Sequence, residues 1–112
     1  MQIVKKNQAN QVNASFSTAI YEYLMDNEDI SGAIADINGR YPEKGFVRNE
    51  VFKELVYVLS GTGKVEVDGK EFRFSQGDTL LILPGEKYFW EGNFRIFMAT
   101  APKFDPNRHK II

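Results

Sequence analysis

The side chains that most often carry out chemistry in proteins are scarce in this sequence. It contains no cysteine, which excludes a thiol nucleophile, a thiolate metal site and a disulfide framework. Its only histidine is His109, fourth from the end of the chain. Imidazole chemistry would therefore require the C-terminal segment to reach the site, and the simpler interpretation is a solvated histidine. Carboxylates, tyrosines and arginines remain as the groups for binding or acid–base chemistry.

The second half of the chain has the pattern of an antiparallel β-domain, in which short apolar stretches alternate with glycine-containing turns. Strands are expected at residues 55–59, 64–67 and 70–74, and the turns that end them at 60–63, 68–69 and 75–78. Each turn contains glycine, which tolerates the positive φ of a tight hairpin. Because charged and apolar residues alternate from residue 64 to 74, the apolar ones should face a core: Val65, Val67, Phe72 and Phe74.

Two more strands are expected at residues 79–83 and 94–99, where the sequence is almost continuously apolar. Strands of this kind are usually covered on both faces. We expect the interior of the domain to cover one face and a second copy of the chain to cover the other, in a homodimer.

The first half of the chain has a weaker pattern. Strands are expected at residues 14–24 and 32–37, with an acidic connection at 25–30 between them. A short helix at residues 17–24 is the alternative for the first strand. A loop rich in turn-forming residues at 38–45 should then lead into a strand at 46–52.

Charge and hydropathy exclude several classes of partner. Fourteen basic and fifteen acidic residues give a net charge of -1, so no basic field is present to attract nucleic acid or anionic lipid. No window approaches the roughly 20 apolar residues of a transmembrane helix, and the N-terminus lacks the apolar core of a signal peptide. We expect a cytoplasmic protein without nucleic-acid or membrane partners. Its 112 residues should form a single domain over residues 1–112.

Two segments resemble the paired motifs of the cupin superfamily. The first motif ends in a glutamate, six residues and a glycine, and Glu54 and Gly61 have this spacing. In the second motif Gly77 and Gly85 keep the glycine spacing, while Tyr88 occupies the position of the histidine. The proline of that motif is displaced by one residue, and a glycine stands where the family has asparagine. The resemblance implies an all-β fold, a cupin-type double-stranded β-helix (jelly-roll barrel) with little or no helix. Its motif region would cover residues 46–99, followed by a polar tail at 103–112.

The same resemblance implies that the metal ligands of the family are missing. The first two family histidines fall on Arg48 and Glu50 or, in the alternative register, on Val47 and Asn49. A transition-metal site in this fold uses about three imidazoles and one carboxylate. We therefore predict no metal site and no cofactor.

A barrel of this kind would have five polar or aromatic side chains around its mouth: Arg48, Glu50, Glu54, Tyr88 and Trp90. This lining predicts a small-molecule site for a sugar or a small polar acid. One alternative is a metal-free sugar isomerase or epimerase that uses Glu50 or Glu54 as base and Tyr88 as acid. Others are a metalloenzyme with an oxygen-rich site, and a structural or regulatory barrel filled by its own side chains, in which Arg48 pairs with Glu50 or Glu54.

Overall fold

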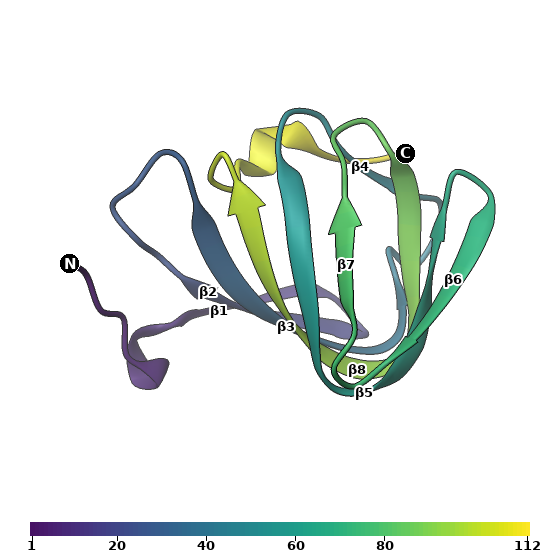
Figure 1. The fold of residues 1–112 in the computed structure, drawn as a ribbon, viewed down its shortest axis with the longest axis horizontal. Helices are drawn as coiled ribbons and strands as arrows, with labels where there is room; N and C mark the ends of the chain where they lie inside the picture. Colours follow the sequence, from purple (N-terminus) through teal and green to yellow (C-terminus); the bar gives the residue numbers. More distant parts are fainter.

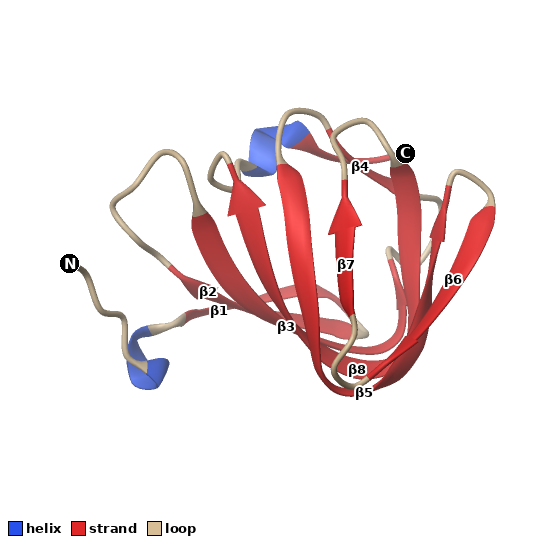
Figure 2. Ribbon diagram, in the orientation of Figure 1, coloured by secondary structure: helices blue, strands red, loops and turns tan.

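The computed structural model describes residues 1–112, and its regular secondary structure is almost entirely β-strand (Figure 2). The strands are β1 (Asn10–Ser15), β2 (Thr18–Tyr23), β3 (Ser31–Tyr41), β4 (Val47–Asn49), β5 (Lys53–Val67), β6 (Lys70–Ser75), β7 (Thr79–Ile82), β8 (Lys87–Ala101) and β9 (His109–Ile111). Two single 3-10 turns, η1 (Lys6–Gln8) and η2 (Pro106–Arg108), complete the chain. The predicted all-β fold with little or no helix is confirmed. No helical segment is long and apolar enough to cross a membrane.

The nine strands form one curled sheet around a common interior (Figure 1). The two longest strands, β5 and β8, pair antiparallel with each other. Strand β8 also pairs with β3 and β4, and β5 also pairs with β6 and β7. Strand β9 at the C-terminus pairs with β4, at the upper rim of the view in Figure 1. The C-terminal segment is therefore part of the sheet.

A bulge in β5 allows this strand to bend around the interior. Its register with β8 shifts between Val58 and Ser60, and the buried side chains change there from even-numbered to odd-numbered positions. Gly63 lies opposite Gly92, and a Cβ atom on Gly63 would lie only 2.7 Å from Cδ1 of Phe94. The strand end predicted at residues 60–63 is wrong. The glycines in this segment do not form a hairpin turn but allow β5 to approach β8 closely.

The turn predicted at residues 68–69 is confirmed. Asp68 and Gly69 have φ angles of 48° and 85°, and Val67 pairs directly with Lys70. Two central residues with positive φ form the two-residue hairpin turn that matches the twist of the strands.

The N-terminal prediction was less accurate. The single strand expected at residues 14–24 is a hairpin of β1 and β2 with Phe16 at its tip, and no helix forms there. Strand β1 is polar and exposed, so it lacks the alternation that marks a half-buried strand. Strand β3 extends to Tyr41, into the predicted loop, because it pairs with β8 as far as Trp90. The strand expected at 46–52 is limited to Val47–Asn49.

Apolar and aromatic side chains fill most of the interior. Phe74, Trp90 and Phe94 form an aromatic cluster with ring centroids 4.8 to 5.7 Å apart. Val65 and Phe74 face the core as predicted, whereas Phe72 is 49% exposed. The outward face of β7 and β8 is uncovered within one chain, since Leu81 and Phe97 are exposed.

Candidate functional site

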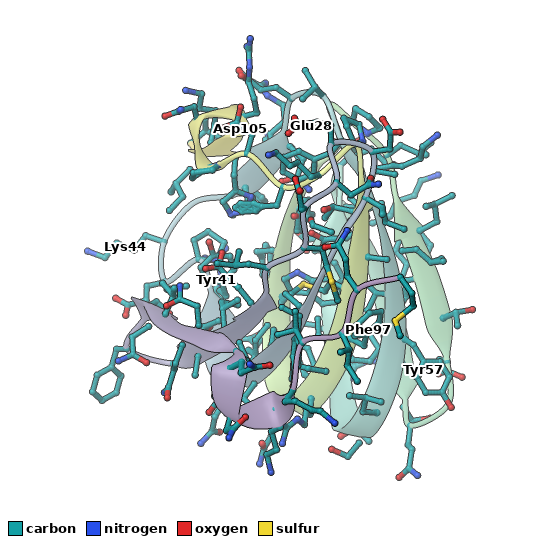
Figure 3. The ribbon with its side chains drawn as sticks, turned by 90° about the vertical axis from the view of Figure 1, so that its left-hand side faces the viewer. Glu28, Tyr41, Lys44, Tyr57, Phe97 and Asp105 are labelled. Carbon is teal, nitrogen blue, oxygen red and sulfur yellow. The ribbon has the colours of Figure 1, made fainter.

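Polar side chains gather at one place in the otherwise apolar interior. They come from five strands and are Tyr41, Asn49, Glu54, Tyr88 and His109, which we call the interior polar group. Asn49, Glu54 and Tyr88 are 0%, 7% and 1% exposed, and the other two are partly buried. In the view of Figure 3 Tyr41 lies below the turn that carries Asp105, and the hydroxyl of Tyr41 contacts His109 of the C-terminal strand.

Strand pairing explains why residues from distant parts of the sequence meet here. Asn49 pairs with His109 between β4 and β9, and Tyr41 pairs with Trp90 between β3 and β8. Residues that pair directly point to the same face, and so do residues two apart in one strand. Tyr88, two residues before Trp90, therefore points to the interior as well.

Hydrogen bonds link four members of the group in a chain. The hydroxyl of Tyr41 lies 2.9 Å from Nε2 of His109, and Nδ1 of His109 lies 2.7 Å from Oδ1 of Asn49. The side-chain amide of Asn49 donates to the hydroxyl of Tyr88 at 3.0 Å. The rings of Tyr41 and His109 are stacked, with an interplanar angle of 9°. These contacts hold all four side chains in place.

Glu54 is the member that can carry charge near neutral pH. It is 7% exposed, no side chain of the protein pairs with its carboxyl, and the carboxyl oxygens keep some accessible surface. Burial raises the pKa of Glu54 to about 7, so both protonation states are populated at neutral pH.

The remaining titratable members are neutral. Burial, and then the charge of Glu54, raise the pKa of Tyr41 to about 12 and that of Tyr88 well above its ordinary value. Burial lowers the pKa of His109, which favours the uncharged imidazole. The group therefore combines one carboxyl with two protonated phenols and a neutral imidazole.

Comparison with known proteins identifies the fold. The sequence model of the EutQ-like cupin domain matches residues 43–97. A structure of an RmlC-like cupin from Shewanella frigidimarina is 15% identical, with a TM-score of 0.75 over 91% of this chain and 91% of that one. The chain is a small cupin.

Other structures with this fold resemble the protein more closely along its whole length. The nucleoside dehydratase Pac13 is 12% identical, with a TM-score of 0.90 over 100% of this chain and 91% of that one. A Streptomyces PAC13 variant with a histidine-to-glutamine substitution, in complex with uridine, is 13% identical, with a TM-score of 0.87 over 96% and 88% of the two chains. No curated protein sequence is significantly similar to this cupin.

The structure brings three of the five sequence-predicted site residues to the interior. Glu54 and Tyr88 belong to the interior polar group, at the two positions where the family has ligand side chains. Trp90 is 3% exposed and packs edge-on against Tyr88, with ring centroids 6.2 Å apart. Whether these residues bind a ligand remains a prediction.

Arg48 and Glu50 are not brought to the interior. Val47 and Asn49 are buried and face inward, so the alternative register is the correct one and Arg48 points to the opposite face of β4. The carboxylate of Glu50 lies 3.4 Å from Nη1 of Arg108. Arg48 forms no ion pair with Glu50 or Glu54.

Three members of the group, Tyr41, Asn49 and His109, are not among the predicted site residues, and Asn49 entered only through the alternative register. Tyr41 falls in the expected loop, although Ala35 and Ile37 earlier in β3 alternate with polar residues as in a strand. His109 was placed in a solvated tail, yet it precedes Ile111 and Ile112, whose apolar side chains are a weak signal of a terminal strand. Pairing between β4 and β9 involves residues about 60 positions apart, which local patterns cannot show.

The donors present in this cupin do not fit a transition-metal site. No group of three or more His, Cys, Asp or Glu side chains is placed to hold a metal ion. The interior polar group offers one imidazole and one carboxyl where such a site uses about three imidazoles. Both nitrogens of that imidazole already form hydrogen bonds within the protein. The absence of a metal from the working protein remains a prediction.

Two hollows on the surface lie away from this group. One is lined by the β1–β2 hairpin around Phe16, and the other by the bend of β5 near Lys64 and Arg73. The first includes Thr18, whose hydroxyl is buried without a hydrogen-bond partner, but neither contains a buried titratable side chain. The interior polar group is the stronger candidate for a functional site.

Proposed function

We propose that the interior polar group binds a small neutral molecule that carries hydroxyl groups, such as a sugar or a nucleoside. The carboxyl of Glu54 is the observation on which this proposal rests, because the residue is only 7% exposed and no side chain of the protein pairs with its carboxyl, whose oxygens keep some accessible surface. A buried carboxyl without a hydrogen-bond partner costs stability. A ligand hydroxyl that donates to Glu54 would remove that cost, and the hydroxyl of Tyr88 is available beside it.

The charge of the group supports a neutral ligand over the small polar acid that the sequence also suggested. That acid was expected to pair with Arg48, which points away from the interior. No lysine or arginine forms a hydrogen bond with any member of the group. A carboxylate ligand would therefore approach Glu54 without a cation to balance the two negative charges.

The structural relatives support the choice of probe. Pac13 is a nucleoside dehydratase, and its variants with a substituted histidine or tyrosine have been solved with uridine. This cupin has a histidine and two tyrosines in its interior polar group. Uridine is accordingly the first probe, together with a panel of common monosaccharides.

Proton transfer to and from the bound molecule is a second function that a specific observation favours. A general base is most effective when its pKa lies near the working pH, and burial places the pKa of Glu54 at about 7. Tyr88 keeps its proton and is the acid next to that base. This arrangement suits an isomerase, epimerase or dehydratase that acts without metal. Exchange of a substrate C–H for deuterium in D2O, followed by mass spectrometry, distinguishes such an enzyme from a binding protein.

Isothermal titration calorimetry with uridine and the monosaccharide panel tests the binding proposal. We expect saturable binding to the native chain and roughly tenfold weaker binding for Glu54→Gln and Tyr88→Phe, since one hydrogen bond is worth about 1.4 kcal/mol. The surface variants Glu50→Gln and Tyr57→Phe are matched controls and should bind as the native chain does. If no probe binds and none raises the melting temperature, the alternative of a structural barrel is favoured.

A further inference from the structure

The hydrogen bonds of the interior polar group have a direction, which the chemistry of Asn49 determines. A side-chain amide donates only through its nitrogen and accepts only through its oxygen. Nδ2 of Asn49 donates to the hydroxyl of Tyr88, so Oδ1 must accept from Nδ1 of His109. His109 therefore carries its proton on Nδ1.

The tautomer of His109 in turn determines the role of Tyr41. In a neutral imidazole with its proton on Nδ1, Nε2 can only accept a hydrogen bond. The hydroxyl of Tyr41, 2.9 Å away, must then donate to Nε2. The proton of Tyr41 is used inside the protein, whereas Tyr88 receives a hydrogen bond and keeps its own proton free.

We propose that His109 is a positioning residue of the interior site, which sets the direction of this hydrogen-bond chain so that Tyr88, and not Tyr41, presents its proton to the ligand. This inference rests on the proposed function of the group as a ligand site. It makes the C-terminal segment a necessary part of that site, because His109 is the only member that comes from β9.

The opposite direction is chemically possible and gives a clear alternative. If the amide of Asn49 were turned over, Nδ2 would donate to Nδ1 of His109, and Nε2 would carry the imidazole proton. Nε2 would then donate to Tyr41, and Tyr88 would donate to Asn49. Tyr41 would then be the tyrosine with a free proton. The tautomer of His109 therefore reports the direction of all the hydrogen bonds in this series.

Several contacts hold the C-terminal segment, and with it His109, in place against the sheet. The backbone groups of Phe46 and Ile112 form two hydrogen bonds of 2.8 Å, and the backbone N–H of Glu50 donates to the carbonyl of Arg108 at 2.8 Å. The ring of Phe104 packs between Phe52 and His109, at centroid distances of 5.3 and 5.5 Å. Backbone hydrogen bonds before and after His109, and the contact of its ring with Phe104, thus hold this residue in place.

Nitrogen-15 NMR of the native chain tests the inference directly, because the chain has a single histidine and the spectrum needs no assignment. We expect the signature of a neutral imidazole with the proton on Nδ1, the less common tautomer of an unconstrained histidine. A proton on Nε2, or on both nitrogens, at neutral pH would overturn the inference. This measurement is independent of any ligand, so a failure of uridine to bind would count against the proposed function alone.

Substitution of the histidine provides the second test. His109→Phe keeps an aromatic ring next to Tyr41 but removes both nitrogens, and we expect roughly tenfold weaker uridine binding in calorimetry. Lys110→Ala, at an exposed position of the same strand, is the matched control and should bind normally. Unchanged binding by a folded His109→Phe variant would show that His109 does not position the site. Circular dichroism establishes that each variant is folded.

Discussion

Oδ1 of Asn49 lies 2.7 Å from Nδ1 of His109, which joins the middle of the chain to its C-terminal strand inside the protein. Through the same amide, Asn49 donates to Tyr88. One side chain that is 0% exposed therefore satisfies the buried hydroxyl of Tyr88 and the partly buried imidazole of His109. Its removal should affect stability as well as ligand binding.

Asn49→Ala is expected to lower the free energy of unfolding by about 3 kcal/mol. The substitution leaves both the Nδ1–H of His109 and the hydroxyl of Tyr88 without their partner, and each unsatisfied buried group costs about 1 to 3 kcal/mol. Urea denaturation followed by circular dichroism measures the change. Asn13→Ala, on the exposed strand β1, is the matched control and should change stability by less than about 0.5 kcal/mol. Equal stability of the two variants would contradict this role of Asn49.

Glu54→Gln should become more stable relative to the native chain as pH rises. Because burial raises the pKa of Glu54 from 4.5 to about 7, the folded protein keeps a proton that the unfolded chain releases. Titration of Glu54 therefore lowers the free energy of unfolding of the native chain as the pH rises from about 4.5 to about 7. The total decrease is on the order of 3 kcal/mol. The amide of Gln in the variant does not titrate. The free energy of unfolding of Glu54→Gln should therefore rise relative to that of the native chain across this pH range.

Chemical denaturation at pH 4, 6 and 8 measures that difference. Glu50→Gln, at a surface carboxylate that pairs with Arg108, is the control and should follow the native chain. A constant difference between Glu54→Gln and the native chain would show that Glu54 ionises as an ordinary exposed carboxyl.

Gly63→Ala should destabilise the fold more than Gly77→Ala does. A Cβ atom at Gly63 would lie 2.7 Å from Phe94 and 2.8 Å from the carbonyl oxygen of Glu91, so strands β5 and β8 would have to separate. At Gly77 the space is open, and only the positive φ of 93° opposes alanine, at a cost of about 1 kcal/mol. Melting temperatures of the two variants test this order, and a greater loss for Gly77→Ala would contradict it.

We propose that the outer face of β7, β5 and β8 is the interface of a homodimer. Leu55 pairs with Leu81 and Tyr57 pairs with Phe97, so four exposed apolar side chains lie side by side on this face. Figure 3 shows Tyr57 and Phe97 on the same side of the molecule, away from Tyr41. Continuous apolar patches on a protein surface usually mark a contact with another protein.

Sedimentation velocity tests this proposal. The native chain should sediment as a dimer at micromolar concentration, and Leu81→Glu should sediment as a monomer because it buries a charge at the interface. Glu66→Gln, at a position of β5 beyond these four apolar side chains, should remain dimeric. A monomeric native chain would exclude the homodimer.

Local chemistry determined which parts of this fold could be predicted from sequence. The Asp68–Gly69 turn was predicted correctly because its two residues are those that accept positive φ. The same reasoning failed at residues 60–63, where Gly63 makes room for Phe94 on a neighbouring strand. A glycine that allows two strands to approach each other cannot be distinguished from a turn glycine in a single sequence.

The candidate site was only partly predictable for a related reason. Glu54 and Tyr88 follow from motif spacing, and the structure places both in the interior. Asn49 appeared only as one of two registers, since a strand of three residues carries too few side chains to show which face is buried. Tyr41 and His109 join the group through pairings between distant strands, which depend on the whole fold.

The fluorescence of the single tryptophan tests the central claim most directly, because Trp90 is buried against Tyr88 inside the barrel. Titration with uridine and with the monosaccharide panel should produce a saturable change for at least one probe. The ligand concentration that gives half of this change should be about tenfold higher for Glu54→Gln than for the native chain. For Glu50→Gln it should equal that of the native chain. A probe that binds in calorimetry without altering Trp90 emission, or that binds Glu54→Gln as tightly as the native chain, would show that the ligand site is not the interior polar group.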